Sequence, residues 1–331
     1  MITVCVDAMG GDEKPEVVLE GIAAALKRDQ DLSVLVAGNE EYVLSFCESH
    51  ERAKALVTTQ EIGMDEHPAQ AVRTKKDSSI VRGCAAVKAG QADGFFSAGS
   101  TGAILSAATL GIGRIRGIKR PAIGAILPGR DGHQTVLLDM GANADIRSDM
   151  IVQFARMGAA YAHAALGVTT ARIGLLSNGE EDTKGSELVL AYHAALREGF
   201  MQDDSCVFAG NCEGTDILNG TFDVIVCDGF TGNVALKSME GTAKYLMHAI
   251  KQATKQSFLS KLGVALLIPA LRGIAGSLSG DENGGAVLLG LKAPVLIGHG
   301  ATSVEAVMNG TLATARCIRA DVCNKIAQDV A

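Results

Sequence analysis

Tryptophan is absent from this chain of 331 residues, and aromatic residues make up only 4 % of it. Long apolar runs are absent too, because none approaches the ~20 residues that a helix needs to span a bilayer. The first residues, MITVCVDAMGG, have neither the basic start nor the long apolar stretch of a signal peptide. We therefore expect a cytoplasmic protein that associates with membranes only peripherally.

Paired cysteines are also missing. The eight cysteines are scattered, no CxxC pair occurs, and no Cys/His cluster has the spacing of a zinc site. Most of them stand in apolar runs, so we expect buried, reduced thiols and no bound metal. The net charge of −7 excludes a nucleic-acid-binding role for the chain as a whole.

The common nucleotide and catalytic motifs are absent. No GxxxxGK[ST], GxSxG or HExxH occurs, and no histidine stands beside a serine or cysteine in a recognisable nucleophile setting. The stretch GIGRIRG (111–117) misplaces the last glycine of a dinucleotide fingerprint and follows a helix-like run, so it is discounted. We therefore expect no cofactor, and, if the chemistry is acyl transfer, a nucleophile that is the anion itself.

Short β-branched runs alternate with longer Ala- and Leu-rich stretches along the chain, of which 47 % is apolar and 20 % charged. Strands are predicted at Ile2–Val6, Leu32–Ala37, Gly94–Ser97, Ile123–Leu127, Thr135–Asp139, Arg172–Leu176, Asp223–Cys227 and Val295–Gly298. Helices are predicted at Pro15–Arg28, Glu40–Glu48, Asp77–Ala89, Ala103–Leu110, Asp149–Ala165, Gly185–Glu198, Val234–Lys255 and Thr302–Ala327. The alternation predicts an α/β fold with a doubly wound, mostly parallel sheet, in a single unit (1–331) of two interlocked halves.

Small or polar clusters follow six of the predicted strands. They read VDAMGGD (6–12), FSAGSTGA (96–103), LDMGANAD (138–145), LLSNGEEDTKG (175–185), CDGFTGN (227–233) and GHGATS (298–303). Because ligands bind beyond the carboxyl ends of strands in open α/β sheets, we expect all six clusters on one edge of the sheet. In SAGSTG, bare glycine backbone, hydroxyls and a helix start would form a cradle for phosphate or carboxylate. The alternative is an ordinary glycine-rich turn with hydroxyl caps.

Two of these clusters carry side chains suited to an oxyanion. If a helix starts within NGEEDTKG, Glu180 and Lys184 would share one of its faces, because they are four residues apart. Lys184 would then lie beside a bound oxyanion. The alternative is a capped helix start with a surface ion pair. In DGFTGNVALK (228–237), the Asn233 amide either caps the next helix or donates to a developing oxyanion.

An ordered set of motifs resembles the bacterial phosphate acyltransferases of the PlsX family. The matching stretches are DAMGGD, RTKKDSS, SAGSTGA, GRIRGIKRPAI, DMGAN, NGEEDTKG, GNCEG, VIVCDGFTGNVALKSMEG and GGAVLLGLKAPVLIGHG. They occur in order and span nearly the whole chain. One departure is Ser100, where the family more often has Asn.

The resemblance implies a fold like that of isocitrate and isopropylmalate dehydrogenases, with three α/β/α layers around one mixed sheet, and a homodimer. It also implies a reaction of long-chain acyl-[acyl-carrier-protein] with inorganic phosphate, which gives acyl phosphate and free carrier protein. The product would feed a membrane acyltransferase that acylates glycerol 3-phosphate, the route to phospholipids. At pH 7 much inorganic phosphate is already a dianion, so it can attack the thioester without a protein nucleophile.

On this reading the enzyme must hold phosphate, stabilise the tetrahedral oxyanion and help the thiolate leave. Catalytic roles are assigned to Lys184, Asn233, His299 and Asp228, with His299 as the group that protonates the leaving sulfur; Asp7 and Asp139 would orient them. Phosphate or thioester binding is assigned to Gly10, Gly11, Ser97, Gly99, Ser100, Thr101, Gly102, Asn143, Asn178 and Lys237.

A basic, apolar stretch runs from 241 to 280 without any Asp or Glu. Its ten-residue uncharged run, Leu262–Leu271, contains Pro269 and is too short to span a membrane. It would dip into an anionic bilayer surface, receive an acyl chain or dock the acidic carrier protein; the alternative is a helical pair in a dimer interface. The residues assigned to this contact are Lys255, Lys261, Leu262, Leu266, Ile268 and Arg272. A second basic strip, Arg73, Lys75, Lys76 and Arg82, is another docking candidate.

Three other functions compete with this assignment. A dehydrogenase of the isopropylmalate type would need a dinucleotide fingerprint, which the sequence lacks. A short-chain phosphotransacetylase would use coenzyme A and differ in chain-length preference. A non-enzymatic membrane scaffold would bind lipid without phosphate-dependent loss of thioester.

Overall fold

The computed structural model describes residues 1–201, 204–253, 284–300 and 303–330 and contains one sheet of eleven strands in the order β3-β2-β1-β4-β11-β10-β5-β6-β9-β7-β8. The strands are β1 (Ile2–Asp7), β2 (Leu32–Gly38), β3 (Ala53–Val57), β4 (Gly94–Ser97), β5 (Ala122–Pro128), β6 (Gln134–Leu138), β7 (Ala171–Leu176), β8 (Cys206–Cys212), β9 (Val224–Val226), β10 (Ala286–Leu289) and β11 (Val295–Ile297). The helices are α1 (Glu16–Arg28), α2 (Glu40–Glu48), α3 (Pro68–Thr74), α4 (Ser79–Lys88), α5 (Thr101–Gly111), α6 (Ser148–Leu166), α7 (Glu187–Gly199), α8 (Gly229–Ala253), α10 (Val304–Arg319) and α11 (Val322–Val330).

The sheet is the middle of three layers. Side chains of a strand alternate between its two faces, so Val4 and Val6 of β1 enter one apolar core and Cys5 enters the other. Helices α1, α2, α6, α7, α10 and α11 contribute to the first core, and α3, α4, α5 and α8 to the second. This is the three-layer, mixed and mostly parallel α/β architecture that the sequence predicts.

The two halves of the sheet run in opposite directions. Strands β3, β2, β1, β4 and β11 are parallel to one another, and so are β6, β9, β7 and β8. Between them, β10 is antiparallel to β11 and β5, and β5 is antiparallel to β6. The expectation that all six clusters share one edge is therefore wrong.

The carboxyl ends of the two halves nevertheless approach the same line. One row of paired residues crosses the sheet through Val6, Phe96, Leu296, Val287, Gly124, Leu138, Val226 and Leu175. In most of these strands the paired residue is the last or next to last. The strand exits of both halves thus meet near the middle of the sheet, on either side of β10 and β5.

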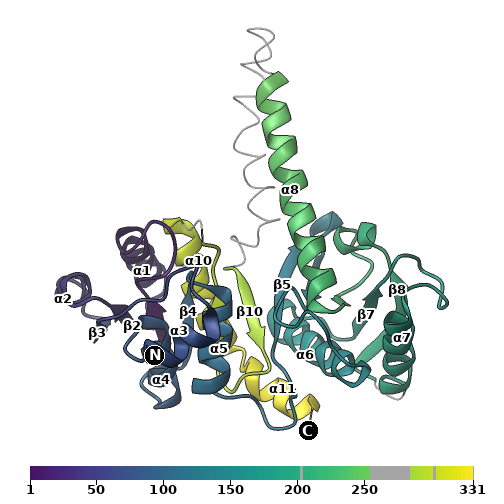
Figure 1. The fold of residues 1–331 in the computed structure, drawn as a ribbon, viewed down its shortest axis with the longest axis horizontal. Coiled ribbons are helices and arrows are strands. Elements are labelled where there is room, and N and C mark those ends of the chain that lie inside the picture. Colours follow the sequence, from purple (N-terminus) through teal and green to yellow (C-terminus); the bar gives the residue numbers. More distant parts are fainter. Residues whose placement is uncertain (202–203, 254–283, 301–302, 331) are drawn as a thin grey trace.

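The chain ties the halves together near its end. Figure 1 shows the N-terminal half with α1 to α5 on one side, the half with β7, β8, α6 and α7 on the other, and β10 and β5 between them. After β10 and β11 rejoin the first half, α10 packs against α1 and α11 packs against α6 of the second half. Helix α8 rises between the halves and extends beyond them (Figure 1).

Four elements were not predicted from the sequence. Strands β3 and β8 lie at the two edges of the sheet, where burial is incomplete and the strand pattern is weak; β8 also contains Gly210 at φ +103° beside a register shift. Strand β10 and helix α3 are short, at four and seven residues.

Two predicted helix boundaries are wrong. Helix α8 begins at Gly229 rather than Val234, so the Asn233 cluster is inside the helix. The predicted helix over 302–327 is two helices, because Asp321 adopts φ +53° between α10 and α11. The predicted contact residues Lys255, Lys261, Leu262, Leu266, Ile268 and Arg272 lie outside the described residues.

The cysteine prediction is confirmed in its main point, since all eight are free and six are buried. The exceptions are Cys47 and Cys323, which are half-buried. Within the described residues, no helix is long and apolar enough to cross a membrane.

Candidate functional site

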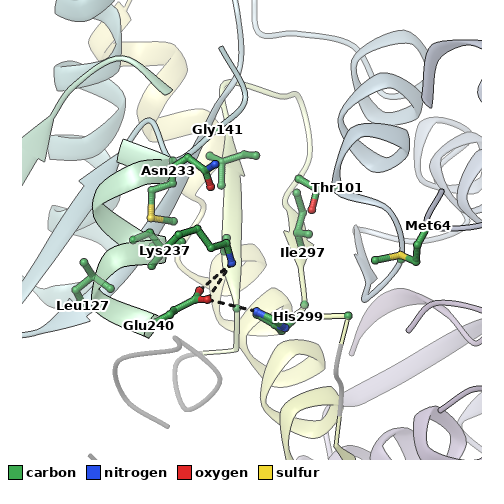
Figure 2. Close-up of a pocket in the computed structure, with 18 residues that line it drawn as sticks. Met64, Thr101, Leu127, Gly141, Asn233, Lys237, Glu240, Ile297 and His299 are labelled. Atoms are coloured by element: carbon green, nitrogen blue, oxygen red, sulfur yellow. Dashed lines mark hydrogen bonds and ion pairs between the residues drawn. The ribbon is translucent and has the colours of Figure 1, made fainter. Parts of the chain in front are cut away.

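A cavity of about 380 Å³ lies over the central strands, on the face that also carries α5 and α8. Figure 2 shows Asn233, Lys237 and Glu240 of α8 on one side of it and Thr101 and Met64 on the other. The two walls therefore come from opposite halves of the sheet. The strand exits that meet along the central row thus enclose a common space.

Two predicted clusters, after β4 and β11, line the first wall, and the cluster after β1, with Gly10 and Gly11, packs behind them outside the cavity lining. A Cβ atom on Gly10 would lie 2.8 Å from the Gly99 nitrogen, so only glycine permits this approach of the first cluster to the second. The backbone N–H of Asp12 donates to the Gly300 carbonyl at 2.9 Å, which adds the cluster after β11. Gly11, at φ +98°, completes the turn.

Buried hydrogen bonds shape the turn that precedes α5. Ser97 Oγ donates to Asp7 Oδ2 at 2.7 Å and accepts from the Gly99 N–H at 3.0 Å. Asp7 also accepts from the Met9 N–H at 2.9 Å. Burial raises the pKa of the Asp7 carboxyl, although these hydrogen bonds act in the opposite direction. Ser97 and Asp7 therefore position the turn, and their polar atoms are engaged with each other.

The N-terminus of α5 opens into the cavity. Gly99 and Thr101 line it, Thr101 is exposed, and Ser100 at the N-cap makes no side-chain cap hydrogen bond. The first N–H groups of a helix have no partner within the helix, and they carry its positive dipole end. Gly102 lies in this first turn, against Pro68 of α3. An anion in the cavity would meet these donors directly.

Helix α8 forms the second wall because its start is pressed against the turn after β6. A Cβ on Gly232 would lie 2.0 Å from the Asp139 carbonyl oxygen, and one on Gly229 would lie 2.5 Å from the Asn143 carbonyl oxygen. Asn233 itself packs on Gly141, which has φ +129°. The glycines of DMGAN and DGFTGN thus bring these two predicted clusters together.

Residues 233, 237 and 240 share one face of α8, because they follow the i, i+4, i+7 spacing. Lys237 Nζ donates to both carboxylate oxygens of Glu240, at 3.1 and 2.9 Å. His299 Nε2, from the opposite half, lies 3.9 Å from Glu240 Oε2 (Figure 2). The Glu240 side chain is only 8 % exposed, whereas that of Lys237 is 54 % exposed.

Glu240 was missed by the sequence reasoning. It is the one carboxylate among the residues that line the described cavity, and it lies within 4 Å of two predicted site residues there, Lys237 and His299. A signal was available, since Glu240 follows Asn233 by seven residues and Lys237 by three, and so falls on their helical face.

The side chains of Asp139 and Asn143 form hydrogen bonds to the surrounding backbone. Asp139 is fully buried and accepts from the N–H groups of Ile123, Gly141, Ala142 and Asn143. The Asn143 amide donates to Asp139 and to the Pro121 carbonyl, both at 2.8 Å. Burial raises the pKa of the Asp139 carboxyl. These contacts fix the turn that supports α8, and they occupy the Asn143 donors.

Asp228 caps the start of α8. Its carboxylate accepts from the Thr231 N–H at 2.8 Å and from the Thr231 hydroxyl at 3.0 Å. It is not among the residues that line the cavity. Its position suits orientation of α8, and with it Asn233, rather than contact with a ligand.

The NGEEDTKG cluster lies outside the cavity lining. Helix α7 begins at Glu187 after the Ser186 cap, so Glu180 and Lys184 are in a loop and the shared helical face is wrong. Lys184 is exposed, with its Nζ 4.0 Å from Glu181 Oε2. Asn178 is also exposed. The catalytic and binding roles assigned to these two residues stay predictions.

The floor of the cavity is apolar. Ile123, Ala125 and Leu127 alternate along β5 and face the cavity together with Met140 and Ile297. An apolar group lying on this floor would have the α5 N-terminus on one side and the Asn233 amide on the other. In the part of the chain that the structure describes, no three His, Cys, Asp or Glu side chains form a group that could hold a metal ion.

The cysteines near these clusters are poor nucleophiles. Burial raises the pKa of the Cys5 thiol and of the Cys227 thiol well above the usual value, and neighbouring carboxylates act in the same direction. The thiolate form that attacks a carbonyl is therefore disfavoured at neutral pH at both sites. Neither thiol is therefore suited to act as a nucleophile at neutral pH.

Comparisons with known proteins bear on what this site does. A family model described as "Fatty acid synthesis protein" matches residues 2–325. A phosphate acyltransferase of Bacillus cereus (strain B4264) is 42 % identical over 319 residues, covering 96 % of this chain and 95 % of that protein. A phosphate acyltransferase of Limosilactobacillus reuteri (strain DSM 20016) is 45 % identical over 311 residues, covering 92 % and 90 %.

Solved structures with the same fold are more distant in sequence. A branched-chain phosphotransacylase from Enterococcus faecalis V583 aligns with a TM-score of 0.64 at 16 % identity, covering 96 % of this chain and 99 % of that one. The EutD phosphotransacetylase from Staphylococcus aureus aligns with a TM-score of 0.59 at 17 % identity, covering 96 % and 94 %. At these identities the likeness establishes the fold.

Proposed function

Because the chain belongs to the phosphate acyltransferase family and is therefore an acyltransferase, we propose that it transfers a long-chain acyl group from an acyl-carrier-protein thioester to inorganic phosphate. The products are acyl phosphate and free carrier protein. The observation that carries the proposal is the cavity itself: the N-terminus of α5, a helix end suited to an anion, and His299 lie on one side of an apolar floor, and the Asn233 amide and Lys237 lie on the other.

Phosphate occupies the N-terminus of α5. The backbone N–H groups of Thr101 and Gly102, in the first turn of α5, have no partner within the helix, and the Thr101 hydroxyl adds a donor. Lys237 has three ammonium hydrogens, of which Glu240 takes two, so one remains for a phosphate oxygen or the developing oxyanion. The acyl chain lies on the β5 floor, with its carbonyl carbon over the phosphate.

A phosphate oxygen attacks the thioester carbonyl, so a carbon–oxygen bond forms and the carbon–sulfur bond breaks. The Asn233 amide and Lys237 stabilise the negative charge that develops on the carbonyl oxygen. His299, held near the Glu240 carboxylate, gives a proton to the departing sulfur. No covalent acyl-enzyme is required, in keeping with the raised thiol pKa values of Cys5 and Cys227.

An assay of palmitoyl-carrier-protein consumption with and without inorganic phosphate tests this function. We expect release of free carrier thiol only with phosphate, together with an equal amount of acyl phosphate trapped by hydroxylamine. Sulfate in place of phosphate is the control for an ionic-strength effect. Phosphate-independent thioester loss, or an obligatory acyl group on the protein, would exclude direct attack. Equal use of acetyl-coenzyme A would favour a short-chain phosphotransacetylase.

We further propose that the enzyme is a homodimer that works at an anionic membrane surface, where its product is passed to a membrane acyltransferase for phospholipid synthesis. Exposed apolar side chains along α8, including Phe230, Tyr245 and Leu246, support a contact with a second copy. The sequence pattern of 241–280, apolar and free of acidic residues, supports attraction to anionic lipid.

Replacement of Leu266 and Ile268 by Glu should reduce sedimentation with phosphatidylglycerol vesicles, because charges oppose insertion of an apolar segment. Replacement of the exposed Leu188 and Leu190 of α7 by Glu is the matched control and should change nothing. Equal sedimentation of both variants and the unmodified protein would refute insertion by this segment.

A further inference from the structure

We propose that a second, basic groove docks an acidic protein, and, resting on the proposed function, that this protein is the carrier that delivers the acyl thioester. The groove has a volume of about 390 Å³ and lies between α3, α5 and the turn that precedes β5. It is distinct from the reaction cavity, and the sequence reasoning did not identify it.

The charge of the groove is all of one sign. Arg73, Arg114, Lys119 and Arg120 line it, and no acidic residue is among its described lining. This is unusual for a chain whose net charge is −7. Three of the four cations come from one seven-residue segment, RIRGIKR (114–120), which also carries Arg116. Such a field attracts an acidic partner and orients its approach.

Two of these cations are available to a partner. Lys119 is paired with Asp149, and Arg114 donates to the Lys119 carbonyl. Arg73 and Arg120 are exposed and make no hydrogen bond or ion pair with any described residue. Their guanidinium groups present fork-like donors that suit carboxylates.

The groove also offers apolar contact. Leu110 is 68 % exposed, and the half-buried Leu105 lies on the same side of α5. Leucine side chains flanked by unpaired arginines match a helix that is acidic on its rim and apolar at its centre. Charge pairs at such a rim govern the association rate and its salt dependence, and the apolar centre adds affinity.

The position of the groove relative to the cavity favours a substrate-delivering partner. Helix α5 begins at Thr101 in the cavity wall and passes Leu105, Thr109 and Leu110 in the groove. At about 1.5 Å of rise per residue, nine residues separate the two ends by about 14 Å. A partner bound in the groove would hold a tethered thioester within reach of the α5 N-terminus.

The basic strip predicted from the sequence is largely neutralised. Lys75 Nζ lies 2.6 Å from Glu66 Oε1, and Arg82 is paired with Asp77. Of that strip, only Arg73 lines the groove. We therefore assign the docking surface to the groove and not to the strip. In the groove, Arg73 lies with the cations of 114–120.

Charge reversal tests the proposal. The Arg73→Glu/Arg120→Glu variant is compared with Lys27→Glu/Arg28→Glu, which makes the same charge change at the exposed end of α1, on the opposite face of the sheet. Binding of fluorescently labelled holo-carrier protein is measured by anisotropy at 50 and 300 mM salt. Turnover of palmitoyl-carrier protein is measured alongside.

We expect the groove variant to bind the carrier roughly tenfold more weakly at low salt, as the loss of several exposed charge pairs implies. Its KM for palmitoyl-carrier protein should rise by a similar factor with kcat within twofold, and the difference should shrink at high salt. The α1 variant should behave like the unmodified protein.

Several results would overturn the proposal. One is that the groove variant binds the carrier as tightly as the unmodified protein does, and another is that the α1 variant binds it as weakly as the groove variant does. A third is that the groove variant changes its oligomeric state. A fourth is that the groove variant loses vesicle binding but still binds the carrier. Phosphate-dependent turnover with an unchanged KM would reject the groove and leave the proposed function standing. Salt-dependent carrier binding by the groove without any turnover would support the groove and reject the proposed function.

Discussion

Replacement of Glu240 by Gln tests the arrangement around which the cavity is built. The amide has nearly the same shape as the carboxylate but no charge, so packing is preserved while the link between Lys237 and His299 is lost. A surface ion pair of the i, i+3 kind would contribute little. Glu240 differs because its side chain is only 8 % exposed and faces basic side chains from both halves of the sheet, Lys237 and His299.

The size of the effect follows from the contacts. Hydrogen bonds to charged groups contribute about 1.5–3 kcal/mol each, and Lys237 makes two of them, although its own exposure weakens them by solvent screening. Loss of about 1.5–3 kcal/mol in the transition state corresponds to a fall in kcat of roughly 10- to 150-fold. In the variant, the ammonium group of Lys237 is no longer neutralised by the Glu240 carboxylate, so its attraction for phosphate is not weakened. The KM for phosphate should therefore fall or stay constant.

The assay is steady-state release of carrier thiol at varied phosphate, with thermal unfolding followed in parallel. Glu41→Gln, at the exposed start of α2, is the matched control and should be unaffected. A structural role for Glu240 would lower the melting temperature and leave kcat per folded molecule unchanged. A kcat within twofold of the unmodified enzyme would refute the reasoning.

Four further substitutions have defined outcomes. Asn233→Ala should lower kcat about 100-fold with an unchanged circular dichroism spectrum. We expect Lys184→Ala to lower kcat strongly as well. Unchanged kcat in both variants would refute the catalytic roles assigned to these two residues. Gly232→Ala should cost about 1–3 kcal/mol in urea denaturation, because the new methyl meets a backbone carbonyl at 2.0 Å; equal stability would contradict the close approach. The Arg319 hydrogen bond lowers the pKa of Asp29, so its contribution of about 1 kcal/mol is present at pH 7 and is lost as pH falls below 3.8. Asp29→Asn should therefore destabilise at pH 7, and the difference should shrink as pH falls below 3.8 and through the lowered pKa of the folded state; a pH-independent difference would refute the pairing.

The central strands and most helices could be predicted from the sequence because burial dictates their composition. Runs such as Ile2–Val6 and Ile123–Leu127 are apolar on both faces, and this pattern is strong. The edge strands β3 and β8 could not be predicted from the sequence, because they face solvent on one side and mix polar with apolar residues. Strand direction could not be predicted either, because it depends on the antiparallel pairing of β5 and β10 and not on local sequence.

The candidate site was predicted in part. Gly10 and Gly99 were predicted to bring backbone close to a ligand, and the structure places both, and also Gly232, against a neighbouring cluster. What could not be predicted is which clusters share a cavity, since that depends on the opposed directions of the two halves. Lys184 has the composition of a site residue yet lies in an exposed loop, while Glu240 gave only a helical-spacing signal.

The late return of the chain to its first half has a consequence for biosynthesis. Strand β4 pairs with β11, and α1 packs against α10, whose residues follow it by almost the whole length of the polypeptide. A nascent chain that has emerged from the ribosome only as far as α8 therefore presents an unpaired strand edge and an uncovered apolar helix face. Such surfaces favour aggregation and chaperone binding. The first half of the sheet can therefore be completed only after β11 and α10 have left the ribosome.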